Sequence, residues 1–165
     1  MKKIRIVSCG AGNRAYGQIL MLARMEEYDL VGVCDLYKDK AETIVNKVKE
    51  LYNQEPPVYT DYIKMFEELK PDAVLVSTPW DTHVKISCDA MERGIAVAME
   101  VGGAYSEEEC WELFKQYAEM VGAVIEEEDE NDCGPSYEIA KTIQEKIIKM
   151  VEETFGVPFP MSKDG

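Results

Sequence analysis

Short apolar runs alternate with helical patterns along the first 125 residues of the chain. Apolar residues at helical spacing mark amphipathic helices, and compact apolar runs are typical of buried strands. The expected helices cover residues 13–28, 38–51, 62–69, 81–93 and 106–120, and the expected strands cover residues 4–8, 30–34, 58–59, 73–77, 95–99 and 123–125. This alternation predicts an α/β fold with a doubly wound parallel sheet, the Rossmann fold, covered by helices on both faces.

Two helix ends carry clear signals. Ser106 and Glu109 have the spacing of a capping box, which indicates a helix beginning at that point. Gly94 follows the helical pattern of residues 81–93 and is expected to end it as a C-cap residue. The helix 106–120 has one apolar stripe, formed by Cys110, Leu113, Phe114, Tyr117 and Val121.

The pattern changes after residue 125. Residues 126–132 read E-E-E-D-E-N-D, a run of like charges that we interpret as a solvated loop. A divalent metal site is the alternative, but nothing fixes the ligand geometry, so no metal is predicted. Residues 135–155 form an amphipathic helical pattern, and an irregular tail follows. We therefore expect an α/β domain over 1–125 and a C-terminal region over 126–165, whose helix could join two copies of the chain.

Composition narrows the function classes. The 165 residues suit one domain, and 46% apolar residues indicate a folded core. A net charge of -14 repels nucleic acid and anionic lipid, so neither is an expected partner. The five cysteines, an odd number, are expected to be reduced and buried; they are Cys9, Cys34, Cys88, Cys110 and Cys133. We see neither a signal peptide nor a membrane span, and expect a cytoplasmic protein.

The segment V-S-C-G-A-G-N-R-A-Y-G follows the first expected strand and opens the first expected helix. Gly10, Gly12 and Ala15 occupy the small positions of the pattern G-x-G-x-x-[G/A], which binds the pyrophosphate of a dinucleotide. Gly10 permits a tight turn, Gly12 lets a phosphate approach the main chain, and Ala15 allows close packing of helix on strand. Asn13 and Arg14 begin the helix, whose free N–H groups attract anions. Arg14 either adds a cation or is solvated.

Asp35 ends the second expected strand, where a carboxylate can accept hydrogen bonds from the ribose hydroxyls of the adenosine half. The same carboxylate would repel a 2′-phosphate, so NAD is favoured over NADP. The alternative to a dinucleotide site is an empty doubly wound domain in which the glycines only shorten a turn.

Two further segments follow strands and are expected at the same edge of the sheet, where ligands of open parallel sheets bind. The first, S-T-P-W-D-T-H, includes Thr78, Pro79 and His83, and the second, M-E-V-G-G, includes Glu100. Pro79 could shape its loop. His83, the only histidine, is the one candidate catalytic residue, although a structural role is the alternative. Glu100 ends a buried strand, and a hydroxyl of the nicotinamide ribose would be a suitable partner for its carboxylate.

These motifs together resemble one family. Residues 3–125 are similar to the nucleotide-binding domain of the Gfo/Idh/MocA oxidoreductases in the stretches C-G-A-G-N-R-A-Y-G, V-G-V-C-D, Y-T-D-Y-I-K-M-F, S-T-P-W-D-T-H and G-I-A-V-A-M-E. The T-P-W-x-x-H and E-V-G-G-A-Y-S details look most like the branch of NAD-dependent glycosidases. The resemblance implies an NAD(P)-binding Rossmann domain, with a sugar or polyol placed over the nicotinamide.

The chain departs from the family pattern in two ways. Many members have Glu-Lys-Pro where this chain has Glu100-Val101-Gly102, so the usual acid–base lysine is missing, as it is in the glycosidase-like branch. Family members also continue into a substrate-binding α/β domain, which residues 126–165 do not resemble. Three functions stay open: a stand-alone NAD-binding module, an NAD-dependent oxidoreductase or redox-assisted glycosidase completed by a partner chain, and an interaction protein that has lost the ligand.

Overall fold

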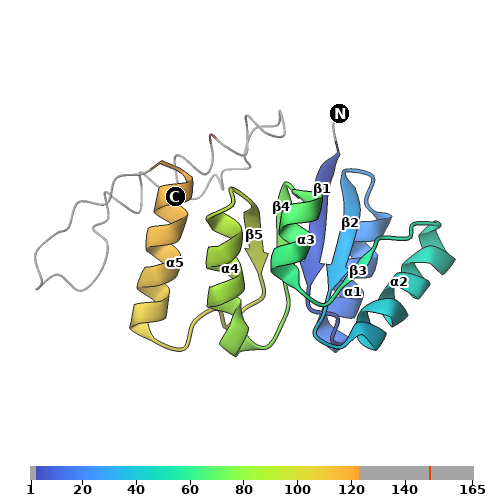
Figure 1. Cartoon of the computed structure of the whole chain (residues 1–165), viewed down its shortest axis with the longest axis horizontal. Helices are drawn as coiled ribbons and strands as arrows, with labels where there is room; N and C mark the ends of the chain where they lie inside the picture. The colour runs from blue at the N-terminus through green and yellow to red at the C-terminus, as the bar shows by residue number, and fades with distance from the viewer. Residues whose placement is uncertain (1–2, 123–148, 150–165) are drawn as a thin grey trace, which may run out of the picture. The chain divides into compact units, whose positions relative to one another are not determined.

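The computed structural model describes residues 3–122 and Lys149. Residues 1–114 form one compact unit and residues 115–165 a second. The first unit contains a five-stranded parallel sheet with the strand order β3-β2-β1-β4-β5 (Figure 1). The strands are β1 Ile4–Cys9, β2 Tyr28–Cys34, β3 Val58–Tyr59, β4 Ala73–Val76 and β5 Ala96–Met99. The order reverses between β1 and β4, and this switch point is where open α/β sheets bind their ligands.

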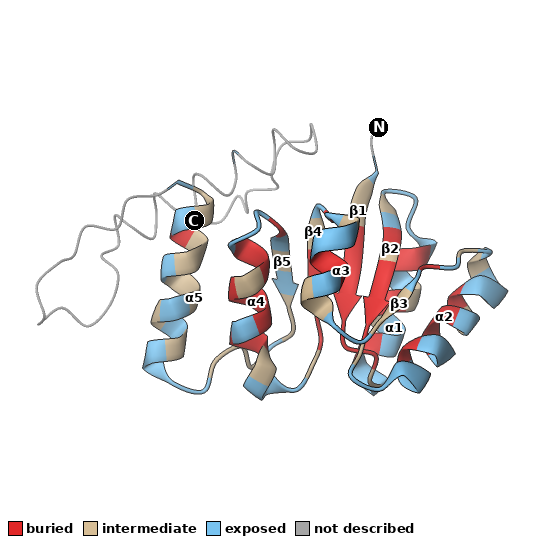
Figure 2. Ribbon diagram, viewed as in Figure 1, coloured by how far each residue is buried: buried red, intermediate tan, exposed pale blue. Residues whose placement is uncertain are grey.

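Helices connect the strands and cover both faces of the sheet (Figure 2). The helices are α1 Asn13–Arg24, α2 Lys38–Tyr52, α3 Tyr62–Leu69, α4 His83–Met91 and α5 Glu107–Met120, and a 3₁₀ turn, η1 Trp80–Thr82, precedes α4. On one face α1 and α2 pack on β1 and β2, with Ile19 and Val48 fully buried. On the other face α3 and α4 pack on β1 and β4 around Phe66 and Val74. The α/β fold predicted from the sequence is confirmed.

Most predicted elements are present, and two of the predicted helices differ most from their expected bounds. The first helix ends at Arg24 rather than at residue 28, because Tyr28 opens β2 and pairs with Ile4. The helix expected over 81–93 is a 3₁₀ turn followed by α4, with Gly94 beyond it at a φ of +70°. Ser106 caps α5 as predicted, since its Oγ accepts a hydrogen bond of 3.2 Å from the N–H of Glu109.

The cysteine prediction holds only in part. Cys9, Cys34 and Cys88 are free and buried, whereas Cys110 is free but exposed. Cys110 follows the acidic first turn of α5, Glu107–Glu109, and its side chain is on the exposed part of the helix. The strand expected over 123–125, the acidic run 126–132, Cys133 and the helix expected over 135–155 lie outside the described residues. Oligomer formation through that helix therefore stays a prediction.

Candidate dinucleotide site at the carboxyl edge of the sheet

The turn after β1 depends on Gly10. Gly10 has a φ of +101°, which side-chain-bearing residues rarely adopt. A Cβ at this position would also lie 2.6 Å from the carbonyl carbon of Ser77 and 2.9 Å from the N of Thr78. The N–H of Gly10 donates to the carbonyl oxygen of Cys34 at 2.8 Å. The fold itself therefore requires a glycine here, with or without a ligand.

Gly12 is different, because the fold does not require it. Its φ is −78°, an ordinary value, and a Cβ placed on it would meet nothing within 4 Å. Gly12 is the N-cap of α1 and offers no side-chain cap, so the first N–H groups of the helix face outward without a partner from that residue. Ala15, one turn further, is fully buried against the sheet as expected. Open space at a bare helix N-terminus suits an anion.

The Asp35 carboxylate lies beside this turn and is fixed by two main-chain groups. Its Oδ2 accepts a hydrogen bond from the N–H of Ala11 at 2.7 Å, and its Oδ1 accepts one from the N–H of Tyr37 at 2.9 Å. An ionised carboxylate has about four acceptor positions, so two remain for hydroxyl groups. The neighbouring Leu36 is 83% exposed. Asp35 thus connects the end of β2 to the glycine turn, a role that the sequence did not indicate.

His83 lies beneath the segment that follows β4. Its side chain is only 1% exposed, and its Nε2 is 2.7 Å from the carbonyl oxygen of Thr78. Because a carbonyl can only accept, Nε2 carries a hydrogen and donates to it, and the buried Nδ1 has no hydrogen-bond partner among the described residues. Pro79 is exposed, and Thr78 also accepts a bond of 2.8 Å from the hydroxyl of Thr82. For His83, this arrangement favours a structural role, in which the ring holds the loop after β4, rather than a catalytic role.

Glu100 follows β5, and its carboxylate already has partners within the protein. Its Oε1 accepts hydrogen bonds from Nε of Arg14, at 3.0 Å, and from the side-chain amide of Gln18. The Arg14 guanidinium, as the largest influence, lowers the pKa of Glu100. Ser77 donates from its hydroxyl to Oε1 of Gln18 at 2.9 Å. Sequence reasoning missed Gln18, although its i,i+4 spacing from Arg14 puts both side chains on one face of α1.

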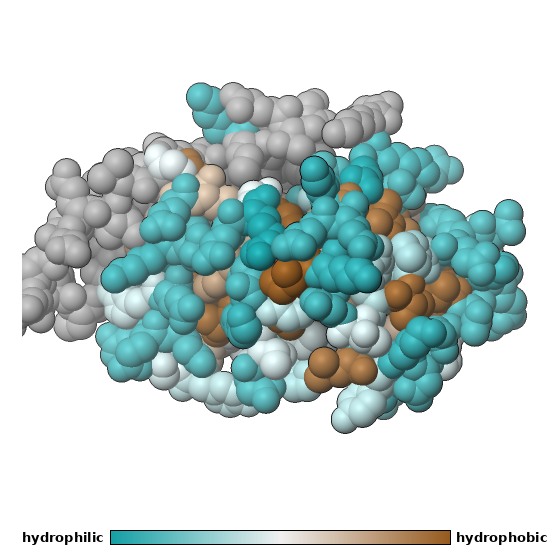
Figure 3. All heavy atoms as spheres, viewed as in Figure 1, coloured by the Kyte–Doolittle hydropathy of each residue, from teal (hydrophilic) through white to brown (hydrophobic). Residues whose placement is uncertain are grey.

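An aromatic pair lies next to this network. Trp80 is 51% exposed, and its ring centroid is 5.9 Å from that of Tyr105. Gly102 has a φ of +85°, and a Cβ there would lie 2.7 Å from Cδ2 of Trp80, so the indole lies directly against the loop after β5. Val101, which follows Glu100, is 79% exposed. The face of the protein in Figure 3 is largely hydrophilic, with hydrophobic residues in separate patches.

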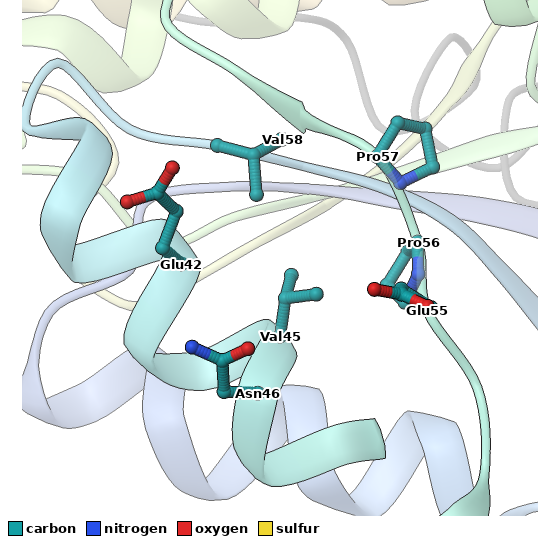
Figure 4. Close-up of a pocket in the computed structure, with 7 residues that line it drawn as sticks. All are labelled: Glu42, Val45, Asn46, Glu55, Pro56, Pro57 and Val58. Carbon is teal, nitrogen blue, oxygen red and sulfur yellow. The ribbon is translucent and has the colours of Figure 1, made fainter.

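An open pocket of about 410 Å³ lies between α2 and the segment that leads into β3. Val45 of α2 points towards Val58, and Pro56 and Pro57 line the opposite side (Figure 4). No predicted site residue lines this pocket, so it is separate from the glycine turn.

Among the described residues, no group of three or more metal-binding side chains could hold an ion. None of the described helices is both long and apolar enough to cross a membrane.

Comparison with known proteins places the chain in a family. A family model described as an oxidoreductase family with an NAD-binding Rossmann fold, GFO_IDH_MocA, matches residues 4–126. The chain belongs to the Gfo/Idh/MocA oxidoreductase family. The expected resemblance, the Rossmann fold and NAD as the cofactor of this domain are thereby confirmed.

Curated relatives in the family are glycosidases by name. Glycosyl hydrolase family 109 protein 1 of Akkermansia muciniphila is 36% identical over 117 residues, which are 68% of this chain and 24% of that protein. Alpha-N-acetylgalactosaminidase of Tannerella forsythia is 30% identical over 115 residues, which are 67% of this chain and 25% of that protein. The chain thus spans about a quarter of the length of these relatives.

Solved structures share the fold. Myo-inositol dehydrogenase from Lactobacillus casei, in complex with NAD(H) and myo-inositol, has a TM-score of 0.65 at 18% identity, covering 72% of this chain and 34% of that one. GenD2 from gentamicin A biosynthesis, in complex with NAD, has a TM-score of 0.66 at 19% identity, covering 75% of this chain and 34% of that one.

Proposed function

We propose that the chain binds NAD(H) along the carboxyl edge of the sheet. The pyrophosphate lies on the glycine turn and the first N–H groups of α1, the adenosine ribose lies on Asp35, and the nicotinamide end extends towards Thr78, Pro79 and Glu100. The observation that carries this proposal is Gly12: the backbone does not need a glycine there, and the space that a side chain would fill is open. A phosphate that approaches the main chain gives that glycine a function.

The Asp35 carboxylate supports a preference for NAD over NADP. Two main-chain N–H groups hold it beside the turn, so it cannot swing away to admit a 2′-phosphate without losing both bonds. Its unused acceptor positions suit the two hydroxyls of a ribose. Discrimination then comes from a fixed negative charge, which attracts hydroxyl donors and repels a phosphate.

We propose further that the domain serves a protein acting on sugars or polyols. The names of the relatives and the myo-inositol in one structural neighbour support this substrate class. When bound, the nicotinamide supplies a carbon that can accept or donate a hydride. The chain's own residues bind and orient the dinucleotide.

The described residues contain no evident acid–base group for the substrate. Val101 cannot transfer a proton, and His83 is buried behind its loop. We therefore favour a dinucleotide-binding module whose substrate site is incomplete within the described residues. The alternative is an active oxidoreductase or glycosidase in which a partner chain completes the site. We also propose a cytoplasmic location, since the described cysteines are all free thiols, which suits a reducing compartment.

Thermal unfolding with NAD, NADH and NADP tests the proposal. A ligand that binds only the native state stabilises it by about 2.7 kcal/mol at 100 times its Kd. We expect NAD and NADH to raise the melting temperature and NADP to do so less. No rise at millimolar NAD(H) would contradict the proposal. If NAD binds, NADH absorbance is followed with myo-inositol, and release of the leaving group from an N-acetylgalactosaminide is followed separately, because a redox-assisted glycosidase forms no net NADH. No change in either assay favours the module, and turnover in either favours the enzyme.

A further inference from the structure

Arg14 and Gln18 of α1 and Ser77 after β4 form a continuous set of contacts around the Glu100 carboxylate. The contacts run from the Ser77 hydroxyl to the Gln18 amide and from that amide to Glu100, which also holds Nε of Arg14. The main chain of Ser77 packs directly against Gly10, and Arg14 lies in the first turn of α1. Both ends of this set of contacts therefore lie at the glycine turn. The set connects α1, which follows the glycine turn, with the segments that follow β4 and β5.

The two charged members differ in exposure, and this difference suggests their roles. The side chain of Glu100 is 16% exposed, whereas that of Arg14 is 75% exposed. The carboxylate is therefore the fixed end of the pair, and the guanidinium reaches into solvent at the start of α1. Only Nε of Arg14 is used in the contact with Glu100, and its terminal nitrogens form no hydrogen bond among the described residues. Those nitrogens have the fork geometry that binds phosphate oxygens.

Electrostatics alone would not place a carboxylate here. The protein carries a net charge of -14, and a further negative charge beside a pyrophosphate repels the ligand. Glu100 can still favour binding if it holds a flexible arginine in the conformation that the ligand needs, because ordering a long side chain opposes binding. The Gln18 amide fixes the carboxylate in turn, since its oxygen accepts from Ser77 and its nitrogen donates to Glu100.

We propose that Glu100 is a positioning residue that holds the Arg14 guanidinium at the glycine turn, where it contacts the pyrophosphate of the bound dinucleotide. Gln18 supports it by orienting the carboxylate. This inference rests on the proposed NAD-binding function, and it replaces the expectation that Glu100 mainly accepts a hydrogen bond from the nicotinamide ribose. The two roles differ in the ligand they affect, because ADP has the pyrophosphate and lacks the nicotinamide ribose.

The test is a double-mutant cycle on the whole chain, with binding of ADP and of NAD measured by calorimetry. Glu100→Gln removes a negative charge and is nevertheless expected to raise the Kd of both ligands about 3- to 10-fold. This factor corresponds to the free-energy cost of ordering one long side chain on binding. In an Arg14→Ala background the same substitution should have little further effect, since the group that Glu100 positions is gone.

Two more variants separate positioning from charge and from folding. Glu50→Gln removes one negative charge from an exposed carboxylate on α2, which is paired with Lys47 at 2.8 Å, and should not weaken the binding of either ligand. Gln18→Met keeps every charge and the helical pattern, and it should weaken both ligands in the same direction as Glu100→Gln. The melting temperature of each free variant shows whether it is folded.

Each other outcome overturns the inference. Weaker NAD binding with unchanged ADP binding assigns Glu100 to the nicotinamide ribose. If Glu100→Gln binds both ligands more tightly, the Glu100 carboxylate affects binding only by repelling the phosphates. An undiminished effect in the Arg14→Ala background shows that Glu100 does not act through Arg14. If the unmodified chain binds neither ligand, the proposed NAD-binding function fails before the variants are compared.

Discussion

Replacing Gly12 by alanine separates what the fold requires from what a ligand requires. The φ of −78° suits alanine, and the added methyl group meets nothing within 4 Å. The matched control is Gly17→Ala, which also adds a methyl group to open space, but within α1 and beyond its first turn. If the first glycines bind a pyrophosphate, only the methyl group at Gly12 interferes with it.

The expected magnitudes follow from the local structure. Gly12→Ala replaces an N-cap glycine and should cost about 1 kcal/mol of stability or less. Gly17→Ala should add about 1 kcal/mol, because alanine favours the helix interior. A hydrogen bond to a charged group contributes about 1.5–3 kcal/mol, so losing one main-chain contact to the phosphate weakens NAD binding about 10- to 100-fold. Gly10→Ala should instead destabilise the free protein, by about 1–3 kcal/mol from its backbone conformation alone.

Calorimetric titration with NAD and urea unfolding of the free variants measure both quantities. Gly12→Ala should unfold at nearly the same urea concentration as the unmodified chain and bind NAD weakly, whereas Gly17→Ala should be more stable and bind normally. Equal NAD affinity of these two variants would refute the assignment of the pyrophosphate to this turn. A strongly destabilised Gly12→Ala variant would refute the argument that the fold tolerates a side chain there.

Three further predictions concern other groups. Asp35→Ala should weaken NAD and reduce the preference for NAD over NADP, measured as the ratio of the two Kd values; an unchanged ratio would remove Asp35 from the ribose site. His83→Ala should lower the free energy of unfolding in urea by about 2–4 kcal/mol, because it empties a buried position and removes the bond to Thr78, whereas a purely catalytic residue would leave stability unchanged. Burial, followed by the charges of Asp35 and Asp61, raises the pKa of Cys34 from 9.0 to about 12; the folded state keeps this proton longer than the unfolded state, so stability should fall as pH rises from about 9 to 12, and Cys34→Ala should flatten that decline in alkaline unfolding curves.

The sequence correctly predicted those helices, strands and motifs that depend on residues close together in the chain. The apolar runs and the spacing of Gly10, Gly12 and Ala15 depend on residues close together in the chain, and they correctly indicated the Rossmann fold and its family. The boundary at Tyr28 was missed because helical spacing continues past Arg24, while pairing with Ile4 on another strand decides where β2 begins.

The candidate site was less predictable, because its contacts join residues far apart in sequence. Asp35 contacts Ala11, and Gln18 contacts Glu100, across separations that no local pattern encodes. The burial of His83 was missed for the same reason: its position after a strand suggested an open crevice, but packing of α4 on the sheet buries its ring. The sequence placed the candidate residues after the strands that carry them, and the structure shows the hydrogen bonds that join Asp35 to Ala11 and Glu100 to Gln18.

The packing of Trp80 against Gly102 provides a natural optical reporter. The chain has two tryptophans, and Trp80 lies on the loops beside Glu100, at the end of the sheet assigned to the nicotinamide. Indole emission overlaps the absorption of reduced nicotinamide, so NADH arriving there would quench Trp80 by energy transfer. If the reduced ring binds beside Trp80, Trp80→Phe should abolish the quenching and Trp111→Phe should leave it unchanged.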